Sequence, residues 1–411
     1  MQSAPSLPSP QLRTLIVVLG MHRSGTSVTT RAMETMGASF GDNLMPPAAG
    51  NNPKGFFEDL DVSRLNIELM QAAGVDWHAP PAPDLDRLTS TQRRDFKDRA
   101  LALLREKCQT GIFALKDPRI ARLLPFWQPV FEALDVRVLY VVAFRHPISV
   151  VRSLEARDSL PVEKSYLLWL THVVPALRYT ANRQRAIVNY DCMMEAPRAS
   201  LQRLAAELNL SLDPGRLDAF ESDFLDDGLR HTRFTGADLA GVDRAPTALK
   251  SLFNSLEIFA SEPSASNKHR LDETLKCAET FLADIAPLLA RDWQFELQSN
   301  QSSLRINELE RELTLAPTRA ADDIAVLEQK QQSSQALIEA LERRCTELEG
   351  ARIDMQATIK SLEHAQSVIK AAASEQRGEL SHLAATLNAV LGSTSWRVTA
   401  PLRAVRRSLS R

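Results

Sequence analysis

Apolar residues in the first half of the chain form short β-branched runs, and stretches with helical spacing lie between them. Such runs predict buried strands, here at residues 14–19, 112–116, 136–144 and 186–190. Apolar positions three and four residues apart predict helices, of which the clearest span 28–36, 61–72, 92–107, 164–182 and 198–208. Alternating strands and helices are typical of an α/β domain whose helices cover both faces of a parallel sheet. We therefore expect a three-layer domain with a central parallel sheet, with its core over residues 12 to about 235.

The segments around this core have patterns of their own. Pro-rich stretches at residues 45–55 and 76–86 predict long loops. Residues 248–297 are helical in pattern, with a break at Glu262-Pro263-Ser264, and we expect this helical segment to complete the domain up to residue 298. Residues 1–11 predict a disordered lead-in, because they are rich in Ser and Pro and lack the regions of a signal peptide.

The last third of the chain has a heptad pattern. Apolar residues alternate at spacings of three and four from Ile338 to Val390, and the seam is interrupted only at Arg352, Gln366 and Gln376. A helix over this span is ~80 Å long at ~1.5 Å per residue and would extend past a small domain, which favours an intermolecular coiled coil over a helix packed on its own domain. We expect a coiled coil over residues 299–391. Its partner through residues 338–390 is a second copy of this chain or another protein.

A basic segment follows the heptads. Residues 392–411 contain five arginines and no acid, beside the apolar residues Trp396, Leu402, Val405 and Leu409. Basic amphipathic tails bind anionic membrane surfaces, so we expect peripheral attachment to a membrane or to a glycan-assembly partner. A solvated chain end is the alternative.

Composition narrows the function classes. The net charge of −2 over 411 residues, with 24% charged residues, indicates no global polycation and therefore no nucleic-acid partner. The four cysteines are widely spaced without a Cys-x-x-Cys pair, which argues for a reducing compartment and against a zinc site. No apolar run reaches the ~20 residues that span a bilayer. We expect a cytoplasmic protein, attached at most to the inner face of the membrane, that holds no metal.

A glycine-bracketed loop between the first strand and the first helix is the clearest candidate for a binding site. Backbone N–H groups in such a loop, with the N-terminus of the following helix, bind phosphate groups. The Gly-x-x-x-x-Gly spacing is that of a P-loop, but Thr26 replaces the expected Lys and the positive charge lies inside the loop at Arg23. The loop is therefore expected to bind one phosphate-like group, through Gly20, His22, Arg23, Ser24, Gly25, Thr26 and Ser27.

A second anion-binding segment follows the strand at 136–144. Arg145 lies at the end of this strand, Pro147 suits the first turn of a helix, and Ser153 lies eight residues after Arg145 on that helix. An arginine at the end of a strand and a hydroxyl on the next helix can bind a second, separate phosphate.

Together these two segments resemble the sulfotransferase family, whose members carry a basic residue followed by Ser-Gly-Thr and an Arg followed eight residues later by Ser. The resemblance covers roughly residues 12–235 and implies a P-loop-like sulfotransferase domain, which we place at 12–298. It implies PAPS (3′-phosphoadenosine 5′-phosphosulfate) as co-substrate, with its 5′-phosphosulfate on the loop and its 3′-phosphate on Arg145 and Ser153. By the same resemblance Tyr190 lies near the adenine. Arg230, in a late basic segment whose local motif differs from the family's, is a further candidate for the 3′-phosphate.

The resemblance also implies the roles of the reacting groups. Arg23 stabilises the charge on the leaving phosphate, and Glu58 is the leading candidate for the general base that deprotonates the acceptor. The alternative for Glu58 is a surface acid that caps the helix at 61–72. Asp59 and His22 are lesser candidates for the base.

A further cluster of charge, Lys116-Asp117-Pro118-Arg119, follows the strand at 112–116. Arg119 is expected either to orient the acceptor or the base, or to form a structural ion pair with Asp117. The tail from Trp396 looks like one found after coiled coils in bacterial enzymes of surface-polysaccharide assembly, which implies a carbohydrate acceptor in a surface polysaccharide or its precursor. A P-loop kinase or NTPase and a non-catalytic assembly protein stay open as alternatives.

Overall fold

The structure is a computed structural model that describes residues 13–48, 52–225, 234–314 and 324–403. It divides into two compact units, Met1–Glu308 and Leu309–Arg411, which are described separately below. The predicted lead-in, the late basic segment with Arg230, and Pro317 lie outside the described residues.

The first unit contains a five-stranded sheet in which all neighbouring strands are parallel. The order is β2-β3-β1-β4-β5, with bounds β1 Thr14–Leu19, β2 Ala38–Ser39, β3 Ile112–Lys116, β4 Arg137–Phe144 and β5 Arg185–Asn189. The four strands expected from the apolar runs are all present, and the two-residue β2 is too short to leave a pattern. The predicted α/β class with a parallel sheet is therefore confirmed.

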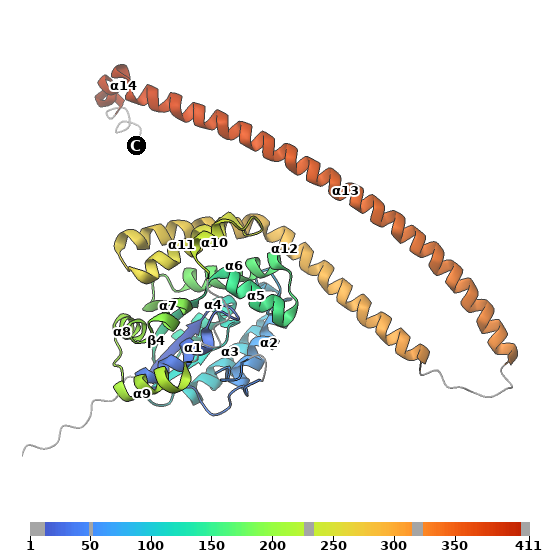
Figure 1. The fold of residues 1–411 in the computed structure, drawn as a ribbon, viewed down its shortest axis with the longest axis horizontal. Helices are drawn as coiled ribbons and strands as arrows, with labels where there is room; N and C mark the ends of the chain where they lie inside the picture. Colours follow the sequence, from blue (N-terminus) through green and yellow to red (C-terminus); the bar gives the residue numbers. More distant parts are fainter. Residues whose placement is uncertain (1–12, 49–51, 226–233, 315–323, 404–411) are drawn as a thin grey trace, which may run out of the picture. The chain divides into compact units, whose positions relative to one another are not determined.

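Helices cover both faces of the sheet, as Figure 1 shows. Side chains of β1 alternate between two apolar clusters, with Leu15, Val17 and Leu19 in one and Ile16 and Val18 in the other. The first cluster is closed by α2 Leu60–Ala72, α3 Ser90–Lys107, α4 Ile120–Glu132, α5 Pro147–Asp158, α6 Val162–Tyr179 and α11 Thr247–Ser261. The second is closed by α1 Thr26–Ala32, α8 Pro197–Leu208 and α9 Pro214–Ala219. Because both faces are buried, β1 is apolar from Leu15 to Leu19 and not alternating.

Two element boundaries differ from the sequence prediction near the glycine loop. The helix expected at 28–36 is α1, Thr26–Ala32, followed by a short 3-10 helix, Met33–Met36. The last strand ends at Asn189, whose side chain accepts the backbone N–H of Asp191 and so begins α7, Tyr190–Glu195. Tyr190 therefore opens a helix and does not end a strand.

The helical segment after the core consists of α10 Gly236–Ala240, α11 and α12 Ala265–Thr314. The break expected at residues 262–264 lies between α11 and α12. The helix α12 runs for 50 residues and ends at Thr314. Trp293 of α12 is buried and donates its indole N–H to the carbonyl of Gly74 at 3.0 Å.

The second unit is dominated by α13, Ile324–Gly392, a helix of 69 residues. The short α14, Thr394–Val398, follows it, with Ser393 as its N-cap. Among the described residues, no helix is long and apolar enough to cross a membrane. A long C-terminal helix is thus present, and its pairing into a coiled coil stays a prediction.

Candidate functional site

The glycine loop joins β1 to α1 beside the carboxyl end of β4. Gly20 has a φ of 151°, and a Cβ there would lie 2.4 Å from the carbonyl oxygen of Ala143 on β4. Gly25 has a φ of 80°, and a Cβ there would lie 2.1 Å from the ring of Tyr190. Both positions therefore require glycine, the first for the approach of two backbones and the second for the packing of Tyr190 on the loop.

The loop and the segment after β4 meet through side chains. Arg23 donates from Nε to Ser153 Oγ at 2.7 Å, which joins the loop to α5. Burial lowers the pKa of Arg23, and the positive charges of Arg157 and Arg145 lower it further. Three arginines therefore add positive charge to one region of the site, and the carboxylate of Asp158 offsets part of it.

Arg145 and Tyr190 form the other wall of this region. The Arg145 guanidinium lies over the Tyr190 ring at 4.7 Å, and its Nε lies 4.0 Å from Asp191 Oδ1. Tyr190 also packs closely on Gly25, so the ring contacts both the loop and the guanidinium. This arrangement offers an apolar ring next to cations, as an aromatic base with phosphate groups would require.

His146 fixes the start of α5 next to Arg145. Its Nδ1 accepts the N–H of Ile148 at 3.3 Å, and its Nε2 lies 3.0 Å from the carbonyl oxygen of Thr235. Burial lowers the pKa of His146, so the neutral ring donates from Nε2 and caps the helix with Nδ1. The backbone at the start of α5 is thereby held in position.

Ser24 and His22 are buried parts of the loop. Ser24 Oγ and His22 Nε2 have no hydrogen-bond partner among the described residues. The His22 ring lies 4.6 Å from the Trp77 ring and 6.2 Å from the His172 ring. Burial holds the pKa of His22 well below its usual value, so the imidazole is neutral.

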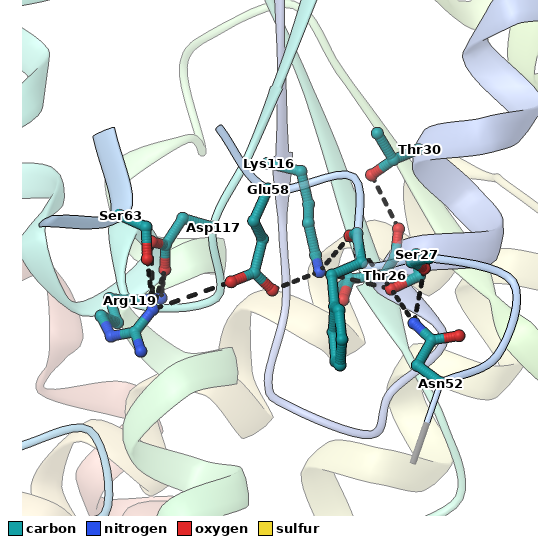
Figure 2. A network of polar contacts seen from close by, with 11 residues as sticks. Thr26, Ser27, Thr30, Asn52, Glu58, Ser63, Lys116, Asp117 and Arg119 are labelled. Atoms are coloured by element: carbon teal, nitrogen blue, oxygen red, sulfur yellow. Dashed lines mark hydrogen bonds and ion pairs between the residues drawn. The ribbon is translucent and has the colours of Figure 1, made fainter. Parts of the chain in front are cut away.

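A buried polar network, shown in Figure 2, connects the loop to β3. Lys116 Nζ contacts Glu58 Oε1 at 2.6 Å, the carbonyl oxygen of Phe56 at 2.9 Å and Ser27 Oγ at 3.3 Å. Asn52 also donates to Ser27 Oγ, at 3.2 Å. The ammonium group is therefore shared between a carboxylate and the loop that would hold the phosphosulfate.

The same network includes Arg119, as Figure 2 also shows. Arg119 makes the ion pair with Asp117 at 3.1 Å, and its Nη1 also lies 3.8 Å from Glu58 Oε2. The ion pair with Asp117 expected for Arg119 is therefore present, and the orienting role stays a prediction.

Glu58 is not the surface acid considered as its alternative role. Its side chain is 6% exposed, and its neighbour Asp59 caps α2 by accepting the N–H groups of Asp61 and Val62, both at 3.1 Å. Asp59 is also paired with Lys107 at 2.6 Å. The capping role therefore belongs to Asp59, and Glu58 stays the predicted base.

Some residues of this site had no assigned role in the sequence analysis. Lys116 was noted only as part of a charged cluster, and Asn52 and Arg157 were not singled out. The register of β3, which places Lys116 beside Val18 of β1, is the signal that brings it to the loop. Arg157 follows Ser153 by one helical turn on α5, so helical spacing alone places both on one face.

Comparisons with known proteins complete the description of the site. No family model matches the chain, and no curated protein matches it. Among solved structures, it is similar to the sulfotransferase domain from the Synechococcus PCC 7002 olefin synthase, at 19% identity and a TM-score of 0.32, over 68% of this chain and 98% of that one.

Two further solved structures are similar to a comparable degree. The sulfotransferase domain from the curacin biosynthetic pathway is 17% identical, with a TM-score of 0.31, over 65% of this chain and 98% of that one. The sulfotransferase STF1 from Mycobacterium tuberculosis H37Rv is 12% identical, with a TM-score of 0.31, over 63% of this chain and 76% of that one. TM-scores this low carry no functional assignment, which has to come from the site itself.

Proposed function

We propose that this protein is a sulfotransferase that moves a sulfuryl group from PAPS to a hydroxyl group of a carbohydrate. The observation that carries the proposal is the hydrogen bond from Arg23 to Ser153 at 2.7 Å. It brings the glycine loop to the helix that follows Arg145, so two anion-binding segments lie within reach of one ligand. The carbohydrate acceptor, of a bacterial surface polysaccharide or its precursor, is proposed from the resemblance of the tail.

The donor fits this site with its two charged ends apart. The 5′-phosphosulfate would lie on the loop N–H groups and the N-terminus of α1, beside Arg23. The 3′-phosphate would lie between Arg145 and Ser153, near the start of α5. The adenine would contact Tyr190. The mutual repulsion of Arg23, Arg145 and Arg157 favours a ligand that carries several negative charges.

The transfer would proceed by in-line displacement at sulfur. Glu58 would take the proton of the acceptor hydroxyl, whose oxygen then forms the new S–O bond. The bond from sulfur to the phosphate oxygen breaks, and the negative charge on this oxygen would be stabilised by Arg23, Lys116 and the loop N–H groups. Arg23 acts by its charge alone, because a guanidinium does not give up its proton at neutral pH.

Lys116 explains how a buried ion pair can serve this chemistry. Without donor, its ammonium neutralises Glu58 at 2.6 Å. When the phosphosulfate occupies the loop, the ammonium has a second anion near Ser27 and shares its charge with it. Glu58 then becomes the better proton acceptor, so the base would become active when the donor is in place.

The decisive experiment supplies radiolabelled PAPS and a glycan extract of host membranes to the purified protein, and measures label in the glycan. The product PAP (3′,5′-bisphosphoadenosine) should bind in the presence of EDTA in calorimetry. Magnesium-dependent hydrolysis of ATP without PAP binding would support the P-loop kinase or NTPase instead. PAP binding without sulfate transfer to any host glycan would favour the non-catalytic assembly protein.

Arg145→Ala is expected to raise the Kd for PAP by about 10- to 100-fold. A charged hydrogen bond to a phosphate contributes on the order of 1.5–3 kcal/mol, and each 1.4 kcal/mol is tenfold in Kd. Calorimetric titration with PAP measures the change. Arg152→Ala is the matched control, because Arg152 is exposed on α5, the helix that follows Arg145, and its guanidinium lies over Phe234 at 4.6 Å. Equal affinities of wild type and Arg145→Ala would remove Arg145 from the site.

Gly25→Ala is expected to weaken PAP binding by at least about tenfold, since the new Cβ would lie 2.1 Å from the Tyr190 ring and displace it. Gly37→Ala is the control, because Gly37 has a similar φ of 86° and open space around its Cβ position. Both variants carry the backbone strain, the clash with Tyr190 should lower the unfolding temperature of Gly25→Ala further, and only Gly25→Ala should lose PAP affinity. Equal PAP affinities of the two variants would contradict the packing of Tyr190 as a part of the donor site.

A further inference from the structure

The long helix α13 exposes apolar side chains along one line. Ile338, Leu341, Leu380, Leu383, Leu387 and Val390 are between 45% and 67% exposed. Alternating spacings of three and four place them in the heptad seam, with Ile338 at an a position and Leu341 at a d position. Single exposed apolar residues are ordinary, but a line of them along a helix of 69 residues indicates a missing partner.

We propose that α13 pairs with α13 of a second copy of this chain, in a parallel and in-register two-stranded coiled coil. Two of the three polar residues of the seam favour a copy over an unrelated partner, whereas the third, Arg352, would meet Arg352 of the second copy. In register, Gln366 meets Gln366 and Gln376 meets Gln376 of the partner, where amides can bond to each other. The antiparallel pairing that keeps the whole seam in contact would place Gln366 against Leu362 and leave its amide without a partner.

The charges beside the seam also fit this arrangement. Arg344 precedes the seam residue Cys345 and takes a g position, and Glu349 takes the next e position. In a parallel coiled coil the g residue of one helix approaches the following e residue of the other, so Arg344 would pair with the Glu349 of the second copy, twice by symmetry. Both side chains are exposed on α13, as this pairing requires.

The first heptad of the seam has the composition of a two-stranded coiled coil. Isoleucine at a with leucine at d favours parallel dimers, and Ile338 with Leu341 follows this rule. A parallel dimer also places both copies of the basic segment that starts at Arg397 at the same end of the coiled coil. Two tails that bind the same anionic surface together hold it more tightly than one.

Disulfide cross-linking tests the register, because Cys345 lies in the seam and is exposed in the single chain. The background is Cys277→Ser, which removes the other exposed cysteine. Copper phenanthroline as oxidant is expected to convert this full-length chain to a covalent dimer on a non-reducing gel, and a further Cys345→Ser change is expected to abolish it. Absence of a dimer through Cys345 would contradict the proposed register.

A second pair of cysteine positions tests the direction of the helices. Leu383→Cys in the chain without Cys277 and Cys345 is expected to cross-link to itself, and Ser381→Cys, at an outward b position, is the control that does not. An antiparallel pairing would instead place Cys345 opposite position 383. Cross-links found only in a mixture of a Cys345 chain with a Leu383→Cys chain would therefore overturn the proposal.

Light scattering at about 20 μM separates this proposal from the proposed function. The wild type is expected to have twice the 45.7 kDa mass of one chain, and Leu380→Asp with Leu387→Asp is expected to give the single mass. Ala385→Asp, on the outer face of the same helix, is the matched control and should stay dimeric. PAP affinity should be the same in all three, because the seam lies outside the donor site. A monomeric or trimeric wild type would overturn the dimer, whatever the result of the sulfate-transfer assay.

Discussion

Glu58→Gln is expected to lower sulfate transfer by about 10²- to 10⁴-fold and to leave PAP affinity unchanged. A general base contributes a factor of this size, and glutamine cannot take up the proton of the acceptor hydroxyl. Its amide oxygen can still accept the Lys116 ammonium, which contacts Glu58 at 2.6 Å in the wild type, so the buried network can persist. Steady-state kinetics with PAPS and the identified acceptor measure the loss, and calorimetry with PAP measures the affinity.

The matched control for this variant is Glu68→Gln. Glu68 lies on the neighbouring helix α2, is 40% exposed and pairs with Arg99, so the same chemical change there should leave turnover and PAP affinity intact. Thermal unfolding of both variants shows whether the fold is kept. Full turnover by Glu58→Gln would show that another group is the base, and His22 would be the next residue to replace.

Acid is expected to destabilise the fold through its buried histidines. His172 is fully buried, and burial lowers its pKa to about 3, while the pKa of His22 is also lowered by burial. Both rings are neutral in the folded protein, whereas the unfolded chain takes up protons below about pH 6.5. Stability is therefore lost as the pH falls through this value, and for His172 the loss continues down to about pH 3. Between pH 7.5 and 5.0, His172 alone should cost about 2 kcal/mol, at about 1.4 kcal/mol per pH unit below the unfolded pKa.

Urea unfolding at these two pH values measures the effect. His172→Gln is expected to lose about 2 kcal/mol less than the wild type on acidification, because its amide does not titrate. His269→Gln is the control, since His269 is exposed on α12. This variant should lose as much unfolding free energy on acidification as the wild type does. Equal losses of unfolding free energy on acidification in wild type and His172→Gln would mean that protonation of the buried His172 ring does not cause the loss.

The fold could largely be predicted from the sequence because it depends on local patterns. Apolar runs make up most of β1, β3 and β4, as a sheet buried on both faces requires. The short β2 and the start of α7 at Tyr190 were missed. Both depend on neighbours: Ala38 and Ser39 become a strand by pairing with β3, and Asn189 ends β5 by capping the next helix.

The residues of the candidate site also divide into those that local patterns predicted and those that depend on distant neighbours. The glycine loop, Arg145 and Ser153 were found because strand, loop and helix signals place them at the ends of parallel strands, where ligands bind. Lys116 and Asn52 were not given roles, since their contact with Ser27 joins segments that are far apart in the chain. A list of charged residues does not show which ammonium reaches which carboxylate.

By itself, the sequence determined the parallel α/β fold, the position of the glycine loop and the heptad seam, because each depends on spacings of a few residues. Only the tertiary structure decided that Arg23 reaches Ser153, that Tyr190 lies on Gly25 and that Lys116 holds Glu58. These contacts arise where the sheet brings separate strand ends together. Burial then makes the electrostatic interactions between the charged groups there stronger than they are in the unfolded chain.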